Sequence, residues 1–332
     1  MSNIINNLAL YSGAVCDPAE QIPPVECKSL HIDRATDRAS LPHVLFVIDE
    51  LCEMGGAERV LLKMIRLMPQ QNFRCSLLTF KVREEIEELK SIPCPVYLLP
   101  LKKTYDWNAV RVANQIRRLI RNEGISIAHT FFETSDLWAG PVAKLSGCPI
   151  LISSRRDMGI LRMGKHWAAY KFSGLFYDKV LAVSPQVKDF CVRQDGLDPA
   201  KVQVLFNGLE MEEVKKAPGR EAMRQKMGIP NLTPVITTIA NIRKIKGIDV
   251  LVKAAGKVCK KYPDALFLIA GRKSEQEYCR ELEDMISALG LGANFQFLGS
   301  REDVLPILKM SDVFCLPSRN EGFSNALIEA MA

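Results

Sequence analysis

The residues best suited to chemistry lie at the end of the chain, in the segment RNEGFSNALIEAMA (319–332). Glu321 follows an apolar run that predicts a strand, and Glu329 lies eight residues later, inside a predicted helix. Carboxylates accept hydrogen bonds from the paired hydroxyls of a ribose or a sugar, and the amides of the intervening turn can hold a phosphate. A solvated acidic face is the alternative, which this glycine-containing turn disfavours. The turn consists of Gly322, Phe323, Ser324 and Asn325.

A second chemically suggestive segment is the basic loop IRKIKG (242–247). Arg243, Lys244 and Lys246 follow a predicted strand, and Gly247 leads into a predicted helix. Cations gathered at a helix N-terminus oppose the helix dipole, so an anion such as a phosphate would offset them. A solvated basic loop is the alternative.

Two neighbouring glycines, Gly55 and Gly56, lie where a predicted strand (43–49) gives way to a predicted helix. Glycines let the backbone approach a ligand closely, and the free amides of a helix start favour an anion. The segment lacks the third glycine of a dinucleotide fingerprint and the Lys-Ser/Thr of a Walker loop. A simple helix cap is the alternative.

Two arginines, Arg155 and Arg156, come at the carboxyl end of another predicted strand. They can bind an anionic acceptor or a donor phosphate, whereas a surface salt bridge with Asp157 or a neighbour is an equal alternative.

The segment 107–124 has the periodicity of an amphipathic helix with a basic polar side, which can touch anionic lipid or simply face solvent while the other side covers a sheet. The polar side carries Arg111, Gln115, Arg117, Arg118 and Arg121.

Composition places the chain among globular proteins. Its 332 residues are 48% hydrophobic and 25% charged, and the formal net charge of +6 is too small to indicate nucleic-acid binding. No apolar run is long enough to span a membrane, and no secretory signal is expected. The ten cysteines lack metal or redox spacing and indicate reduced thiols in a cytosolic protein, while the four histidines are too scattered for a metal cluster.

The elements that must position these residues alternate between short apolar runs and helical patterns, which predicts an α/β protein with parallel sheets. We expect an irregular extension over 1–40, a Rossmann-like domain over 41–212, and a second one over 213–332 that begins after a polar linker (210–219). The second domain is expected to be truncated, because the chain ends inside its last predicted helix. The predicted strands span 43–49, 75–80, 96–100, 125–130, 149–154, 179–184, 201–207, 234–240, 265–271, 295–300 and 313–318.

Taken in order along roughly 43–332, several of these segments resemble the family-4 retaining glycosyltransferases of the GT-B fold. The resemblance implies two Rossmann-like domains facing a central cleft, with a sugar moved from a nucleotide-diphosphate sugar to an acceptor hydroxyl with retention, in surface glycan or glycolipid synthesis. The matching pieces are GGAERV, KVLAVSPQV, KVQVLFNGLE, RKIKGIDVL and EGFSNALIEAMA.

The resemblance also implies roles for individual residues. Glu329 would contact the donor ribose, and Glu321 the donor sugar. The Gly322–Asn325 turn would bind sugar hydroxyls and phosphate, while Arg243 and Lys246 would stabilise the departing diphosphate. The glycine pair of the first domain would approach the same diphosphate.

Two positions depart from the family pattern. Asn241 stands where many relatives have an arginine, so Arg243 is expected to substitute for it. His129 aligns with the first of a histidine pair, and Phe131 occupies the second position. His129 is therefore a catalytic candidate, with a structural histidine as an equal alternative.

No Asp-x-Asp pair follows a strand, so the expected reaction is metal-independent, and the nucleotide sugar is a co-substrate rather than a cofactor. The expected partners are this donor, a glycan or lipid-linked acceptor and an anionic membrane at the inner face, with no nucleic acid. Two other functions stay open: a non-catalytic nucleotide-sugar binder, or inactive fragment, and a sugar-nucleotide epimerase of the same fold.

Overall fold

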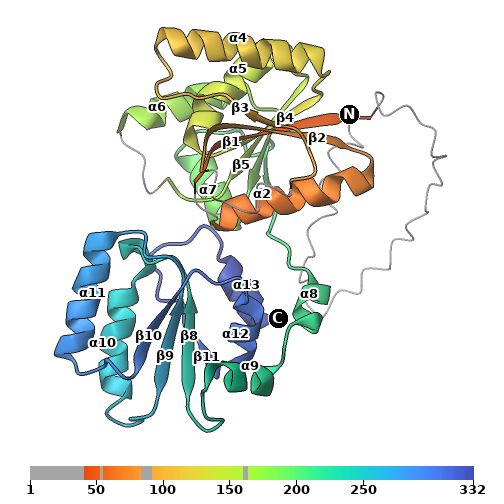
Figure 1. Ribbon diagram of the computed structural model, residues 1–332. Coiled ribbons are helices and arrows are strands. Elements are labelled where there is room, and N and C mark those ends of the chain that lie inside the picture. Colours follow the sequence, from red (N-terminus) through yellow and green to blue (C-terminus); the bar gives the residue numbers. More distant parts are fainter. Residues whose placement is uncertain (1–40, 53–54, 84–91, 160–163) are drawn as a thin grey trace. The chain divides into compact units, whose positions relative to one another are not determined.

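The computed structural model divides the chain into two compact units, Met1–Asn207 and Gly208–Ala332 (Figure 1). The boundary expected from the sequence lay slightly later, after residue 212. The extension expected over 1–40 lies outside the described residues. The structure describes residues 41–52, 55–83, 92–159 and 164–332.

The first unit contains one sheet of seven strands that pair in parallel throughout, in the order β3-β2-β1-β4-β5-β6-β7. All seven coincide with predicted runs, because residues that are apolar throughout can be buried on both faces of a sheet. Their bounds are β1 (His43–Leu51), β2 (Arg74–Val82), β3 (Val96–Leu98), β4 (Ile127–Phe131), β5 (Ile150–Arg155), β6 (Lys179–Ala182) and β7 (Val202–Val204).

Helices cover both faces of this sheet, with α2 on one face and α4 and α5 on the other (Figure 1). The core beneath α2 joins Phe46 and Ile48 of β1 to Leu61 and Ile65 of the helix, all fully buried. The helices of the unit are α2 (Gly56–Leu67), α4 (Trp107–Asn122), α5 (Gly140–Leu145), α6 (Gly164–Ser173) and α7 (Pro185–Arg193).

The second unit is a smaller sheet of four parallel strands in the order β10-β9-β8-β11. Helices α10 and α11 pack on one face, and α9 and α12 on the other. The strands are β8 (Val235–Ile239), β9 (Leu266–Ala270), β10 (Phe295–Gly299) and β11 (Val313–Phe314). The helices are α8 (Met211–Lys216), α9 (Arg220–Met227), α10 (Ile248–Val258), α11 (Gln276–Ala288), α12 (Val304–Met310) and α13 (Asn325–Met331).

The polar segment 210–219, predicted to be a linker, has regular structure in the second unit. It forms the short helix α8, and the unpredicted helix α9 follows. Glutamates in the first turn of α8 and lysines in its last turn complement the helix dipole, and its Val214 is buried. The Lys309 Nζ of α12 donates to the carbonyls of Val214 (2.6 Å) and Ala217 (2.9 Å), which fastens α8 to the unit.

Strand order determines where a ligand site is expected in each unit. In an open parallel sheet, ligands bind beyond the carboxyl ends of the strands, where the strand order reverses. That switch point lies between β1 and β4 in the first unit and between β8 and β11 in the second. Apart from His129, which lies within β4, the candidate residues come after β1, β8 or β11 or at the end of β5, the neighbour of β4.

The described cysteines are free thiols, half of them fully buried. Burial raises the pKa of Cys75 to about 12 and that of Cys148 to about 11, so both stay protonated and pack as small apolar groups. Among the described helices, none combines the length and the apolar character that crossing a bilayer requires.

Candidate functional site

At the switch point of the second unit, the loop after β8 and the loop after β11 are interlocked. The Arg319 amide donates to the Ile245 carbonyl (2.8 Å), and the Arg319 guanidinium pairs with Asp249 of α10 (2.7 Å). Gly247 has a φ of +65° and leaves no room for a side chain, since a Cβ there would lie 2.1 Å from the Pro317 carbonyl oxygen. Only glycine therefore fits where the two loops meet.

This packing brings together two of the predicted catalytic residues. Lys246 Nζ lies 2.6 Å from Glu321 Oε1, and the same oxygen accepts a hydrogen bond from Ser318 Oγ at 2.7 Å. The side chains of Lys246 and Glu321 are 26% and 24% exposed, so each is held in place yet open to solvent. In this half-buried ion pair, the carboxylate can accept hydrogen bonds from hydroxyls and the ammonium group can bind phosphate.

The remaining residues of the β8 loop have distinct environments. Arg243 precedes the 3₁₀ turn Lys244–Lys246 and is exposed. Asn241, which stands in place of the family's arginine, accepts a hydrogen bond from the Arg272 amide at 3.1 Å. It therefore ties the β8 loop to the end of β9, a structural role that sequence reasoning missed.

The other predicted donor-binding residues lie in the turn before α13 and on that helix. Gly322, Phe323, Ser324 and Asn325 are half-buried, as is Glu329. Ser324 caps α13 by accepting a hydrogen bond from the Leu327 amide at 3.3 Å. The turn and Glu321 thus share one continuous loop after β11.

In the first unit, Gly55 and Gly56 occupy the predicted position at the start of α2. Gly55 is the N-cap, and a Cβ there would meet only the flexible Glu58 carboxylate (2.6 Å), so close packing does not require this glycine. At the end of β5, Arg156 is partly exposed and donates to Asn207 Oδ1. Burial lowers the pKa of Arg156 to about 10, which the Glu58 carboxylate partly opposes, so the side chain stays cationic at neutral pH.

The prediction that His129 is catalytic is wrong. Its ring is buried between Phe46 and Phe131, with centroids 5.5 and 4.7 Å away, and its Nε2 lies 2.8 Å from Ser154 Oγ. Burial, aided by the positive charge of Arg156, lowers the pKa of His129 to about 3. A neutral ring enclosed in the core of the sheet cannot touch a ligand, so His129 is the structural histidine of the open alternative.

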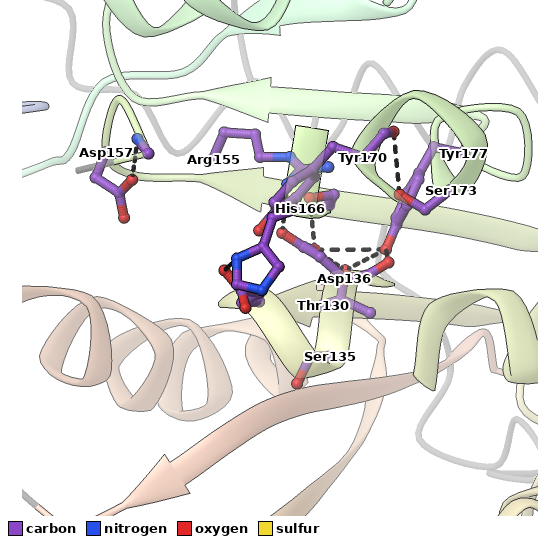
Figure 2. A network of polar contacts seen from close by, with 12 residues as sticks. Thr130, Ser135, Asp136, Arg155, Asp157, His166, Tyr170, Ser173 and Tyr177 are labelled. Carbon is purple, nitrogen blue, oxygen red and sulfur yellow. Dashed lines mark hydrogen bonds and ion pairs between the residues drawn. The ribbon is translucent and has the colours of Figure 1, made fainter. Parts of the chain in front are cut away.

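The prediction that Arg155 binds an acceptor is also wrong. Its side chain is 3% exposed and pairs with Asp136 at 2.9 Å, with its guanidinium 4.4 Å from the Tyr170 ring (Figure 2). Burial alone would lower the pKa of Arg155, but the Asp136 carboxylate together with Tyr170, Tyr177 and Cys191 outweighs burial and raises that pKa above its usual range. Arg155 is the last residue of β5 and enters the interior, whereas Arg156 follows the strand and stays partly exposed.

Sequence reasoning missed the buried network that receives Arg155. Asp136 Oδ1 accepts hydrogen bonds from Thr130 (2.6 Å) and Ser153 (2.7 Å), and the Tyr177 hydroxyl donates to the Asp136 carbonyl at 2.8 Å (Figure 2). Asp136 lies in a π-helix (Ser135–Ala139), a distortion common near functional sites. Asp136 follows the polar residues Glu133, Thr134 and Ser135, so its sequence neighbours did not mark it as buried.

A second carboxylate fixes this π-helix to β1. Asp49 accepts hydrogen bonds from the Thr134 amide (2.8 Å), the Ser135 amide (2.6 Å) and Ser135 Oγ (2.6 Å). Burial raises the pKa of Asp49 to about 6, although the Ser135 hydrogen bonds oppose the change. The preceding Phe132 has a left-handed φ of 71°, which is strained for a bulky residue. The carboxyl edge of β1 and β4 is therefore rigidly built.

No group of three or more His, Cys, Asp or Glu side chains in the described parts of the chain could hold a metal ion. Lys246 with Glu321 in the second unit and Arg156 in the first are charged groups that remain partly exposed at these edges.

Comparison with protein-family models gives two matches. Residues 54–213 match the family described as Glycosyltransferase Family 4, and residues 219–332 match Glycosyl transferases group 1. Together the two matches span most of both units.

Curated relatives are glycosyltransferases. The UDP-Gal:alpha-D-GlcNAc-diphosphoundecaprenol alpha-1,3-galactosyltransferase of Escherichia coli is 23% identical over 84% of this chain and 74% of its own length. A D-inositol 3-phosphate glycosyltransferase of Corynebacterium urealyticum is 33% identical over 42% of this chain. The matched part spans only 35% of the length of that second relative.

Solved structures share the fold. Anabaena Alr3699/HepE in complex with UDP and glucose has a TM-score of 0.73 with 21% identity, covering 87% of this chain and 78% of that one. WaaG, a glycosyltransferase involved in lipopolysaccharide biosynthesis, has a TM-score of 0.66 with 16% identity over the same shares of the two chains.

Proposed function

Because the chain belongs to the family-4 glycosyltransferases of GT-B type, we propose that it moves a sugar from a nucleotide-diphosphate sugar to an acceptor hydroxyl, with retention and without a metal ion. The observation that carries the proposal is the contact between Lys246 and Glu321 at the switch point of the second unit. This contact joins the basic loop 242–247 to the segment 319–332, the two segments whose residue types were best suited to chemistry.

The donor is assigned to the loops after β8 and β11. Lys246 and Arg243 face the diphosphate, Glu321 the sugar, and Glu329 the ribose, with the turn Gly322–Asn325 at the sugar hydroxyls. The anchoring of Glu321 by Ser318 and Lys246 supports this assignment, since a fixed carboxylate orients hydroxyls at a lower entropic cost than a mobile one.

The chemistry needs stabilisation of separating charges. As the bond from the sugar to the diphosphate breaks, negative charge develops on the leaving group and positive charge on the sugar ring. A fixed cation and oriented amides stabilise the leaving group directly. Lys246 supplies that cation, and the Glu321 carboxylate beside it lies where it can face the cationic sugar.

The acceptor is assigned to the carboxyl edge of the first unit, at Arg156. The E. coli relative is named for an acceptor linked to diphosphoundecaprenol. We extend the same class, a glycan or lipid-linked acceptor in surface glycan or glycolipid synthesis, to this chain. Such an acceptor favours a cytoplasmic protein that works at the inner face of the membrane.

The test is donor binding and turnover by the purified chain against a panel of nucleotide sugars. Glu329→Ala should weaken binding of the preferred donor at least about tenfold, the effect of losing a charge-assisted hydrogen-bond pair. Glu281→Ala, an exposed glutamate on α11, is the matched control and should bind as the wild type does. If Glu329→Ala leaves both binding and turnover unchanged, the proposal is wrong. Donor binding without transfer to any acceptor would favour a nucleotide-sugar binder.

A further inference from the structure

The first unit has a groove that lies apart from Arg156, the residue to which the acceptor is assigned. The groove has a volume of about 500 Å³ and lies between the start of α4 and the π-helix, whose Trp138 forms one wall. Trp138 packs edge-on against Phe80 of β2, with ring centroids 6.1 Å apart. In the order of the sheet, β2 is three strands away from β5, which Arg156 follows. The groove is therefore a separate feature of the carboxyl edge.

Three large aromatic side chains line the groove. Tyr105 and Trp107 are 82% and 88% exposed, and Trp138 opposite them is half-buried. The flat face of an aromatic ring carries partial negative charge, whereas the C–H groups on one face of a sugar ring carry partial positive charge. Each exposed ring can therefore hold a sugar ring by stacking, which also removes apolar surface from water.

Polar side chains lie between the aromatic ones. Thr104, Asp106 and Asn114 also line the groove and offer a hydroxyl, a carboxylate and an amide, the groups that exchange hydrogen bonds with sugar hydroxyls. Among the described residues of this lining, Asp106 is the one charged side chain, and it is negative. A phosphate would meet this carboxylate without a cation to offset it, so the lining favours a neutral ligand.

Contacts beside the groove fix both of its walls. Asp106 Oδ1 caps α4 by accepting from the Ala109 amide at 2.8 Å, and Asn108 Nδ2 donates to the Pro100 carbonyl at 2.9 Å. On the other wall, the edge-on contact with β2 holds Trp138 in place. A preformed groove binds a ligand at a lower entropic cost than a mobile loop does.

We propose that this groove binds a neutral saccharide of at least two sugar rings, which stack on Trp107 and Trp138 while their hydroxyls bond to Asp106 and Asn114. This deepens the proposed function, on which it rests for its purpose, because the groove would hold sugars of the acceptor that lie away from the reacting hydroxyl. Binding energy gained at such remote groups positions the acceptor for reaction. The acceptor class is thereby narrowed to one that already carries sugars.

The test is a titration of the whole chain, labelled with fluorotryptophan, with maltose, cellobiose, lactose and diacetylchitobiose in the absence of donor. The chain has three tryptophans, and the third, Trp167, packs against Phe190 and does not line the groove. At least one of these saccharides should shift the fluorine resonances of Trp107 and Trp138 at millimolar concentrations and leave that of Trp167 unchanged. Spectra of the three single Trp→Phe variants assign the resonances.

A matched pair of variants keeps the test specific. Trp107→Ala, which removes an exposed side chain, should weaken saccharide binding about three- to tenfold, the loss expected for one aromatic contact. Tyr262→Ala removes an exposed aromatic ring from the second unit and should bind as the wild type does. If none of the four saccharides shifts the Trp107 and Trp138 resonances, or if the two variants lose affinity equally, the proposal is overturned.

The saccharide proposal and the proposed function can fail separately. Saccharide shifts at Trp107 and Trp138 in a chain that neither binds nor turns over any donor would support the groove and refute the transfer. Donor turnover without saccharide shifts would refute the groove alone.

Discussion

The two switch points handle charge in opposite ways. In the first unit, Arg155 and Asp136 are buried together in a network of hydroxyls, each side chain 3% exposed. In the second unit, Lys246 and Glu321 pair across 2.6 Å but remain about one-quarter exposed. The first arrangement holds a scaffold together, whereas the second leaves its charges accessible to a ligand.

The difference teaches that an ion pair at the end of a strand is not by itself a site. A fully buried pair forfeits hydration and is strongly destabilised when one partner is removed, whereas a pair in contact with water tolerates that loss. Removing one partner of each pair therefore distinguishes a structural pair, whose loss lowers the unfolding free energy, from a binding pair, whose loss lowers donor affinity.

The largest expected effect is that of Asp136→Ala. It leaves the Arg155 charge buried without a counter-ion and two hydroxyls without an acceptor, and should cost about 3–5 kcal/mol of unfolding free energy. All three tryptophans belong to the first unit, so denaturation followed by their fluorescence reports on it.

The matched control is Glu123→Ala, which breaks the partly exposed pair with Arg74 and should cost less than about 1 kcal/mol. Equal costs for the two variants would abolish the contrast drawn between buried and accessible pairs.

The next largest effect concerns the joint between the two loops of the second unit. Gly247→Ala forces a Cβ against the Pro317 carbonyl in a left-handed conformation and should cost about 3 kcal/mol. Gly290→Ala has a similar φ of +66° but open space around the Cβ, so it should cost only about 1 kcal/mol. Hydrogen exchange of the β8 and β9 amides measures both.

A smaller, pH-dependent effect should come from His129. Its folded pKa of about 3 lies below the unfolded value of 6.5, so the unfolded state alone takes up a proton as the pH falls below 6.5. The stabilising contribution is thus complete above pH 6.5 and is lost progressively toward pH 3, by about 1.4 kcal/mol per pH unit.

His129→Gln removes that proton uptake and keeps a group able to bond Ser154. Between pH 6.5 and pH 5 its unfolding free energy should therefore fall less steeply than that of the wild type, by about 2 kcal/mol over the interval. His43, whose pKa burial also lowers, is present in both proteins and cancels. Parallel pH profiles would show that His129 titrates normally.

Much of the fold could be predicted because the strands coincide with short, mostly apolar runs that alternate with helical patterns. The helix α8 could not be predicted, since six residues rich in Glu and Lys show little periodicity. This helix depends on the packing of Val214 and on the hydrogen bond from Lys309 of α12. Tertiary contacts decided its structure, and local pattern did not.

The candidate site divides in the same way. Lys246 and Glu321 could be placed together because both follow strands at one switch point. Arg155 and Arg156 could not be told apart, since the difference depends on where β5 ends and on the π-helix that places Asp136 beside Arg155. His129 was left undecided because its burial also depends on tertiary packing.

The most direct test of the central claim is calorimetric titration of Lys246→Ala with the preferred nucleotide sugar. The account predicts at least about tenfold weaker binding with the unfolding free energy nearly unchanged, because the pair with Glu321 is accessible to water. Lys215→Ala, which breaks the exposed pair with Glu212, should leave both unchanged. If Lys246→Ala binds the donor as tightly as the wild type does, the claim that Lys246 and Glu321 form part of the donor site is contradicted.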